Sequence, residues 1–341
     1  MGLFSFLTRE LAIDLGTANT IIIENDQIIV DEPSIIARDR QTKKVIAIGK
    51  RAMKMHGKTH ENIETIRPLR DGVIADFDAA EQMIKGMINM TRKKMTFFSP
   101  ALRVVIGIPS GSTEVEKRAV RNSAEHCGAK EVYLIYEPMA AALGIGLDIE
   151  APEGNMIIDI GGGTTEIALI SLGGIVEHKS IRTAGDDFTE EIRDYMRKTH
   201  NMKIFDRTAE EIKKNVGSAL ENLDNPPADY IVRGAHITTS LPVEIAVSYQ
   251  EIAKCLDRPL QKIEGALMEV LDKTPPELYS DIYKNGIHLT GGGALLKGLD
   301  KRLSQKTGLK VIVSEDPLHA VAKGTSIALK NYDKYPFLIK N

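Results

Sequence analysis

Cysteine is scarce in this 341-residue chain, and several other signals are missing altogether. The two cysteines, Cys127 and Cys255, have no metal-ligand spacing, and so few cysteines are typical of a protein from a reducing compartment. No apolar run reaches the roughly 18 residues of a membrane-spanning helix. Residues 1–10 lack the basic start and small-residue cleavage site of a signal peptide. We therefore expect a cytoplasmic protein.

The charge balance argues against nucleic acid as a partner. The net charge is −3 with both signs interspersed, whereas nucleic-acid binding requires a basic patch. The common phosphate motifs are missing too. Gly293 and Gly298 have the spacing of a P-loop, but Leu299 stands where its lysine is required, and no dinucleotide-binding glycine motif follows a strand.

The composition is that of an ordinary globular protein, with 43% apolar and 27% charged residues. The length suggests about two domains. Short β-branched runs alternate with longer amphipathic stretches, which predicts an α/β fold. The helix predicted at 113–126 begins with a capping box of Thr113 and Glu116. Further helices are predicted at 77–92, 187–200, 209–220, 249–273 and 294–306.

One pattern occurs twice, a domain length apart. Residues 11–17 read LAIDLGT and residues 156–164 read MIIDIGGGT. Both are an apolar strand followed by Asp, an apolar residue, Gly and a Thr at the turn, and Asp14 and Asp159 are 145 positions apart. The repeat predicts an internal duplication in which each half contributes one loop to a shared cleft.

These loops have the chemistry of a phosphate site. A glycine turn lets backbone N–H groups approach phosphate oxygens, and threonine hydroxyls add donors. A carboxylate beside an anion site is consistent with a bridging Mg²⁺, so Asp14 and Asp159 are candidate metal ligands acting through water. Either loop alone is equally consistent with an ordinary β-turn, since Asp and Gly are common turn residues.

Five motifs resemble those of the actin-like ATPases, in the same order, and the match to the MreB family of bacterial actins covers nearly the whole chain. The motifs are 14–20 (DLGTANT), 67–76 (RPLRDGVIAD), 137–142 (EPMAAA), 159–166 (DIGGGTTE) and 289–296 (LTGGGALL). The resemblance implies the duplicated two-domain actin-like fold, in which two RNase H-like domains enclose a nucleotide cleft. It implies domain I at 1–140 with a small subdomain near 28–72, and domain II at 141–335 with one near 182–250.

The resemblance also implies ATP or ADP with Mg²⁺, and it assigns roles to residues. Glu137 would orient the attacking water, Thr164 would contact the γ-phosphate or that water, and Asp159 would act beside them. The residues implied to bind nucleotide are Gly16, Thr17, Ala18, Asn19, Gly161, Gly162, Gly163, Thr164, Glu210, Glu211, Lys213, Gly291, Gly292, Gly293, Ala294 and Leu295.

Simpler interpretations remain open for some of these residues. Glu137 is also a favourable residue at the start of a helix that has Pro138 in its first turn. Glu210 and Lys213 are spaced as a solvated ion pair on one helix face. The glycines 291–293 are also compatible with a plain strand–helix turn.

Two apolar features interrupt otherwise polar surroundings. Leu3, Phe4, Leu7 and Leu11 recur at helical spacing with Phe6 beside them, and 97–98 is a Phe pair that follows the basic residues 92–94. The N-terminal feature is also consistent with a frayed tail or the start of a strand. The Phe pair is also consistent with an anchor in the protein core. The resemblance implies that both insert into the inner face of the cell membrane, where basic residues add attraction to anionic lipid.

The function implied by the resemblance is an ATP-hydrolysing, self-assembling filament on the membrane. It would organise cell-wall synthesis together with other shape proteins and maintain the rod shape of a bacterium. A monomeric ATPase switch and a small-molecule kinase are the alternatives. One departure from the family pattern is visible, because Phe188 and Thr189 follow Asp187 where the family has a methionine and an acid. The helix start is intact there, but nearby filament contacts would differ.

Overall fold

Two five-stranded sheets of identical topology form the centre of the computed structural model, which describes residues 8–90 and 101–340. The first sheet has the order β10-β9-β1-β2-β3, with β1 (Thr8–Leu15), β2 (Asn19–Glu24), β3 (Gln27–Pro33), β9 (Ala101–Ile108) and β10 (Ala129–Tyr136). The second has the order β13-β12-β11-β17-β18, with β11 (Asn155–Ile160), β12 (Thr165–Ser171), β13 (Gly174–Ile181), β17 (Ile287–Thr290) and β18 (Val311–Val313).

The two sheets match strand by strand. In each, two antiparallel strands lie on one side of the central strand, β1 or β11. Two parallel strands lie on the other side. The shared topology supports the internal duplication that the repeated motif predicts.

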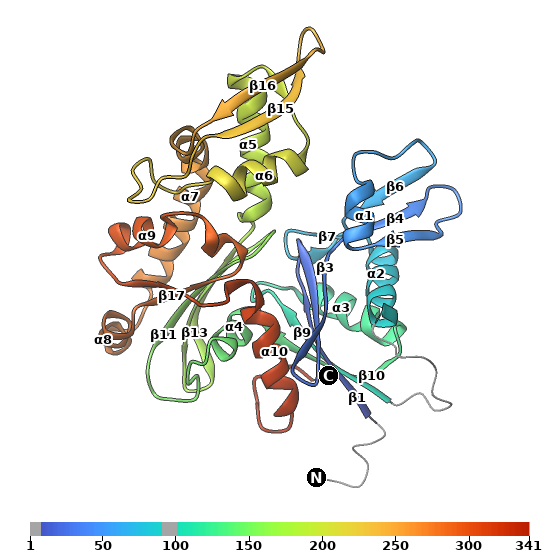
Figure 1. Cartoon of the computed structure of the whole chain (residues 1–341). Helices are drawn as coiled ribbons and strands as arrows, with labels where there is room; N and C mark the ends of the chain where they lie inside the picture. Colours follow the sequence, from blue (N-terminus) through green and yellow to red (C-terminus); the bar gives the residue numbers. More distant parts are fainter. Residues whose placement is uncertain (1–7, 91–100, 341) are drawn as a thin grey trace.

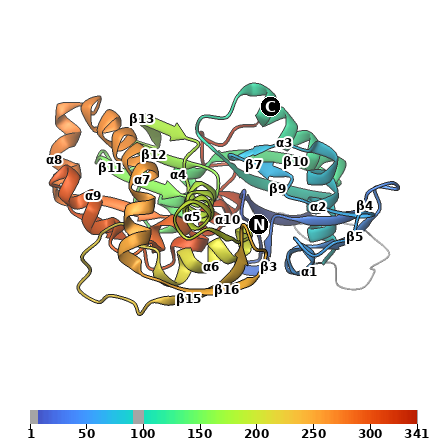
Figure 2. The ribbon, with the colours of Figure 1, turned by 90° about the horizontal axis from the view of Figure 1, so that it is seen from above.

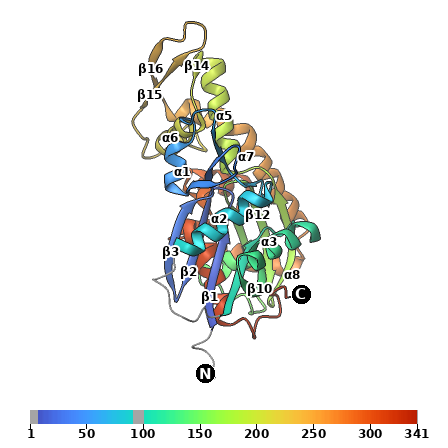
Figure 3. The same ribbon diagram turned by 90° about the vertical axis from the view of Figure 1, so that its right-hand side faces the viewer.

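Smaller sheets extend from one end of each half (Figures 1 and 3). The first half carries β4 (Ile36–Asp39), β5 (Val45–Ile48) and β6 (Ile63–Ile66) with α1 (Lys50–Met55), and a hairpin of β7 (Leu69–Arg70) and β8 (Val73–Ile74). The second carries β14 (Met202–Lys203), β15 (Tyr230–His236) and β16 (Pro242–Val247) with α5 (Gly185–Thr199) and α6 (Asp206–Val216). Apart from β8, which lies just beyond 28–72, these elements fall within the segments predicted as small subdomains, and the domain bounds themselves stay predictions.

Both faces of each sheet are covered, which explains why the central strands are nearly continuous apolar runs. On β1, Ile13 packs toward the outer helices while Ala12 faces a core shared by both halves. On β11, Ile158 likewise packs toward the outer helices, and Ile157 faces the shared core. The outer helices are α2 (Phe77–Met90) and α3 (Glu114–His126) in the first half, and α7 (Tyr249–Asp272), α8 (Pro276–Asn285) and α9 (Leu299–Thr307) in the second. Figure 2 shows the two halves side by side.

Two helices, α4 (Glu137–Gly144) and α10 (Ala320–Lys330), lie between the sheets (Figure 1). Helix α10 packs on β1 and β9 of the first sheet, and α4 packs on β11 and β12 of the second. A Cβ added to Gly144 would lie 1.9 Å from the carbonyl oxygen of Ala320, and one on Gly324 would lie 1.6 Å from that of Ala140. The two helix backbones therefore touch directly, and only glycine fits at the crossing.

Several helix predictions are confirmed and one is wrong. The capping box exists, because the Glu116 N–H donates to Thr113 Oγ1 at 3.3 Å and the Thr113 N–H donates to Glu116 Oε2 at 2.7 Å. The helix predicted at 294–306 is instead a 3₁₀ turn, η2 (Gly292–Leu295), followed by α9. Gly298 has a φ of 74° and interrupts the helix. The predicted helix 209–220 ends early, at Val216.

The last described residues return to the first sheet. The Leu134 N–H donates to Ile339 O at 3.1 Å, and the Ile339 N–H donates to Leu134 O at 2.9 Å, at the β10 edge. Nearby, the Arg103 guanidinium lies 3.9 Å from the centre of the Tyr332 ring. Within 8–90 and 101–340, no helix is both long and apolar enough to cross a bilayer. The predicted membrane residues Leu3, Phe4, Phe6, Leu7, Phe97 and Phe98 lie outside the described residues. The helical spacing predicted to reach Leu11 is wrong at that residue, which is buried in β1.

Substituting the crossing glycine tests this contact. Gly324→Ala should lower the free energy of unfolding by about 2–3 kcal/mol, because its methyl group overlaps the Ala140 carbonyl. Gly265→Ala in α7 is the matched control, since its Cβ meets no atom within 4 Å. The control should stabilise the protein by about 0.5–1 kcal/mol. Urea unfolding followed by far-UV circular dichroism measures both, and equal values for the two variants would contradict a backbone contact at the crossing.

Candidate functional site

The two glycine loops meet at the top of the central strands. Loop one (16–18) joins β1 to β2, and loop two (161–164) joins β11 to β12. A Cβ on Gly162 would lie 2.7 Å from the Cβ of Ala18, and a Cβ on Gly163 would lie 2.7 Å from Thr17 Oγ1. The structure therefore brings together the two loops that the sequence repeat singles out, and it brings them close enough that side chains on these glycines would collide.

A buried hydroxyl pair shapes loop one. Ser34 Oγ donates to the carbonyl oxygen of Gly16 at 2.6 Å and lies 2.9 Å from Thr20 Oγ1. The Ser34 N–H also donates to the Ala18 carbonyl at 2.9 Å. Nothing in the sequence around Ser34 signals its partner Gly16, which lies 18 positions away.

Four carboxyl groups gather beneath the loops. Burial raises the pKa of Asp14 to about 7, opposed by the charge of His319. Burial, then Asp14 and Glu166, raises the pKa of Asp159 to about 8. At the start of α4, burial and then the other three carboxyls raise the pKa of Glu137 well above its usual value. Burial and mutual repulsion therefore oppose the ionisation of Glu137 and Asp159, and a nearby positive charge would favour their ionised forms.

A divalent cation would supply such a positive charge. However, no three acidic or histidine side chains in the described part of the chain are close enough together to hold a metal on their own. Mg²⁺ commonly takes one or two carboxylates and completes its shell with phosphate oxygens and water. Asp14 and Asp159 are therefore compatible with holding, through water, a Mg²⁺ ion that also binds phosphate oxygens.

Glu166 joins the two halves below the loops, and sequence analysis assigned it no role. Its side chain is fully buried. Its Oε2 accepts hydrogen bonds from Ser110 Oγ and, at 2.9 Å, from the Ser110 N–H, while Oε1 accepts from Ser180 Oγ at 2.5 Å. Ser110 follows β9 in the first half, whereas Glu166 and Ser180 belong to the second. These three donors compensate for the burial of the carboxylate.

The residues expected beside the nucleoside are bonded to the start of α5. Lys213 Nζ donates to Gly185 O at 2.8 Å and to Thr189 Oγ1 at 3.0 Å, and it lies 2.6 Å from Glu210 Oε2. Burial alone would raise the pKa of Glu210, but Lys213 and Thr189 hold that pKa below its usual value. The pair is therefore anchored rather than freely solvated. Glu211, on the same helix, is exposed.

The third glycine turn, 291–293, packs against the end of β11. A Cβ on Gly291 would lie 2.3 Å from Asp159 Oδ1, and one on Gly293 would lie 2.2 Å from the Ile160 side chain. Gly291 has a φ of 79°, in the left-handed region that favours glycine. Of the residues that follow, Ala294 is buried and Leu295 is 56% exposed. The turn thus lies beside the carboxyl cluster, as its predicted role requires, although that role stays a prediction.

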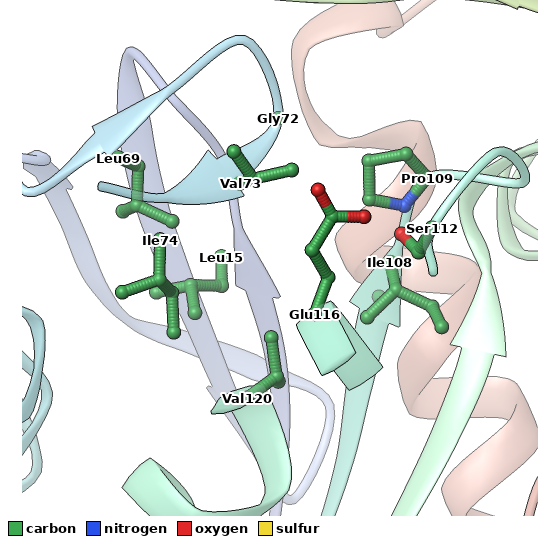
Figure 4. A pocket seen from close by; sticks show the side chains of 11 residues that line it. Leu15, Leu69, Gly72, Val73, Ile74, Ile108, Pro109, Ser112, Glu116 and Val120 are labelled. Atoms are coloured by element: carbon green, nitrogen blue, oxygen red, sulfur yellow. The ribbon is translucent and has the colours of Figure 1, made fainter. Parts of the chain in front are cut away.

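Two hollows in the described structure lie outside the two glycine loops. The first is a cavity of about 10 Å³, which has room for about one water molecule. It is lined by Leu15, Leu69, Val120 and others. The carboxyl group of Glu116 points toward Gly72 and Pro109 there (Figure 4). A larger hollow of about 540 Å³ lies between α7, α9 and residues 219–222. None of the predicted nucleotide residues lines either hollow, so the contacts between the loops define the candidate site.

The buried carboxyl groups predict a pH effect in the absence of nucleotide and metal. Because the folded pKa of Asp159 is about 8 and its unfolded pKa about 3.8, this group disfavours folding increasingly as pH rises between those values. Asp159→Asn should therefore gain stability relative to the parent between pH 5 and 8, by about 1 kcal/mol per pH unit. Urea unfolding at several pH values measures the difference. A difference independent of pH would contradict the raised pKa.

Comparisons with known proteins agree with the sequence motifs. A family model described as MreB/Mbl protein matches residues 8–336. The cell shape-determining protein Mbl of Bacillus cereus is 45% identical over 329 residues, which cover 96% of this chain and 98% of that protein. The cell shape-determining protein MreB of Escherichia coli is 45% identical over 343 residues, which cover 98% and 96%, respectively.

Solved structures show the same fold. MreB5 of Spiroplasma citri bound to AMPPNP is 40% identical, with a TM-score of 0.90 and coverage of 96% of this chain and 97% of that one. The MamK double helical filament, at 18% identity, has a TM-score of 0.80 over 96% of this chain and 100% of that one. The predicted actin-like fold class is therefore confirmed, and the chain belongs to the MreB/Mbl family.

Proposed function

We propose that this chain binds ATP with Mg²⁺ between its two glycine loops and hydrolyses it to ADP and phosphate. The observation that carries the proposal is the convergence of loops one and two over a group of three carboxyls, Asp14, Glu137 and Asp159. The Spiroplasma citri relative, whose structures contain AMPPNP and ADP, supports the choice of nucleotide.

In the proposed site, the backbone N–H groups of Gly16–Asn19 and Gly161–Thr164 bind the phosphates, and the Thr17 and Thr164 hydroxyls add donors. Mg²⁺ beside Asp14 and Asp159 would supply positive charge to the phosphates. The 291–293 turn, with Glu210 and Lys213 opposite, would hold the nucleoside.

Glu137 is the proposed residue that orients the attacking water and accepts its hydrogen bond. It begins α4, and its Cγ would lie 3.7 Å from a Cβ on Gly107 at the end of β9. Burial and the neighbouring carboxyls raise the pKa of Glu137 well above its usual value, so the ionised form that accepts this hydrogen bond would depend on nearby positive charge such as the proposed Mg²⁺. Thr164, which is buried in loop two, would contact the γ-phosphate or the same water.

At the cellular level we propose a cytoplasmic filament protein on the inner membrane face that organises cell-wall synthesis and maintains rod shape. The names of the curated relatives, which are cell shape-determining proteins, support this role. Self-assembly, membrane binding and contacts with other shape proteins are parts of the proposal. Residues 3–7 and 97–98 are the proposed membrane contacts on the strength of their sequence pattern alone.

Two substitutions separate binding from chemistry. Glu137→Ala should retain ATP affinity within about twofold but slow phosphate release by about 100-fold, because the water loses its acceptor. Asp14→Ala should weaken Mg-ATP binding by about tenfold, because a group that holds the metal through water is lost. Fluorescent-nucleotide titration and single-turnover phosphate release measure the two effects. Unchanged release in Glu137→Ala would leave that residue as a helix-start residue only.

Assembly and membrane binding can be tested together on lipid. The parent chain with ATP should pellet with anionic vesicles and appear as filaments lying on the bilayer in electron micrographs. Deleting residues 2–8 and introducing Phe97→Ser and Phe98→Ser should abolish vesicle pelleting, because both apolar anchors are removed. Persistent monomers of the parent with ATP and lipid would favour the monomeric switch or the kinase instead.

A further inference from the structure

A single ion pair connects the backbones of both glycine loops. The Arg67 guanidinium donates to Asp186 Oδ1 from Nη1 and Nη2, each at 3.2 Å, and Nη2 also donates to the Thr17 carbonyl at 3.3 Å. The Asp186 N–H donates to the Gly162 carbonyl at 2.7 Å. A continuous path therefore runs from loop one through Arg67 and Asp186 to loop two.

The two ends of this path belong to different halves of the molecule. Arg67 lies between β6 and β7 in the first half, and Asp186 is in the first turn of α5 in the second. Asp186 is an acidic residue in the first turn of α5, where the helix dipole favours a negative charge.

The segment that carries Arg67 is itself held firmly. Leu69 is buried in the core of the first half, with Ile74 packed against it, so the β7–β8 hairpin is fixed on one side (Figure 4). On its other side, the Gly72 N–H donates to Thr17 Oγ1 at 3.0 Å, and a Cβ on Gly72 would lie 2.7 Å from the Thr164 methyl group. The hairpin thus contacts both loops and presents Arg67 between them.

The pair is only partly buried, with side-chain exposures of 31% for Arg67 and 39% for Asp186. Such pairs usually contribute little to overall stability. Its geometry differs from that of a simple surface pair, because the guanidinium donates with two nitrogens and each partner also bonds the backbone of a glycine loop. The expected effect is therefore on the relative position of the loops rather than on the stability of the fold.

Resting on the proposed nucleotide site, we propose that the Arg67–Asp186 pair is a positioning latch that holds loops one and two together and limits the rate at which nucleotide leaves. Nucleotide between the loops departs when they separate, and separation requires the bonds from Arg67 to Asp186 to break. Neither residue acts on the reacting atoms. Their role is to keep the phosphate-binding N–H groups of the two loops at a fixed spacing.

The test is a double-mutant cycle on nucleotide dissociation. The full-length parent, Arg67→Gln, Asp186→Asn and the double variant are loaded with mant-ADP and Mg²⁺, and release is followed by stopped-flow fluorescence after excess ADP is added. Each single variant should release nucleotide about tenfold faster, because a charge-assisted contact across the loops is lost. The double variant should be no faster than either single variant, because the same contact is removed.

The matched control is Arg233→Gln, which breaks an exposed arginine–glutamate pair between β15 and β16 with a 2.6 Å contact. It should leave dissociation unchanged, and thermal unfolding without nucleotide should change little in every variant. Single variants within twofold of the parent rate, or effects that multiply in the double variant, would overturn the latch while leaving the nucleotide site intact. A parent chain that fails to bind mant-ADP would overturn the proposed nucleotide site and the latch with it.

Discussion

Direct backbone contact between α4 and α10 is the constraint on which the arrangement of the two halves depends. Each helix packs on a different sheet, and they approach one another only because Gly144 and Gly324 carry no side chain. The crossing also determines where Glu137 lies, since that residue begins α4. Close packing of these two helices therefore serves both the joining of the halves and the placement of the proposed catalytic carboxyl group.

The loops of the site are held in place by specific contacts, but the grouped carboxyls beneath them are electrostatically unfavourable. Loops one and two are in contact, and Ser34 bonds the backbone of loop one. Glu166 joins the two halves below the loops, where four carboxyl groups lie close together. Buried carboxyls with raised pKa values disfavour the folded state at neutral pH unless positive charge compensates them. A fold that keeps such groups together is best explained by a ligand that needs them, and this links the energetics of the folded chain to the proposed Mg-nucleotide.

The features that could be predicted from the sequence are those that depend on local backbone chemistry. Both glycine loops, the capping box at Thr113 and the central strands could be predicted because their signals span a few adjacent residues. Glu166 and the Arg67–Asp186 pair could not be assigned roles, since their partners lie 14–119 positions away. Helix α10 was missed because buried residues occur all around it, so it has no amphipathic pattern. The incorrect helix at 294–306 shows how one left-handed glycine overrides helical periodicity.

The strand-like pairing of Ile339 with Leu134 has a consequence for association between molecules. β10 is the outermost strand of its sheet, and such strands recruit foreign strands through their unpaired backbone groups. Here the chain's own tail occupies that position with two backbone hydrogen bonds. A strand of another molecule could pair with β10 here only by displacing the residues around Ile339. A fusion partner joined closely to the C-terminus would weaken the pairing of Ile339 with Leu134 and expose the β10 edge to aggregation.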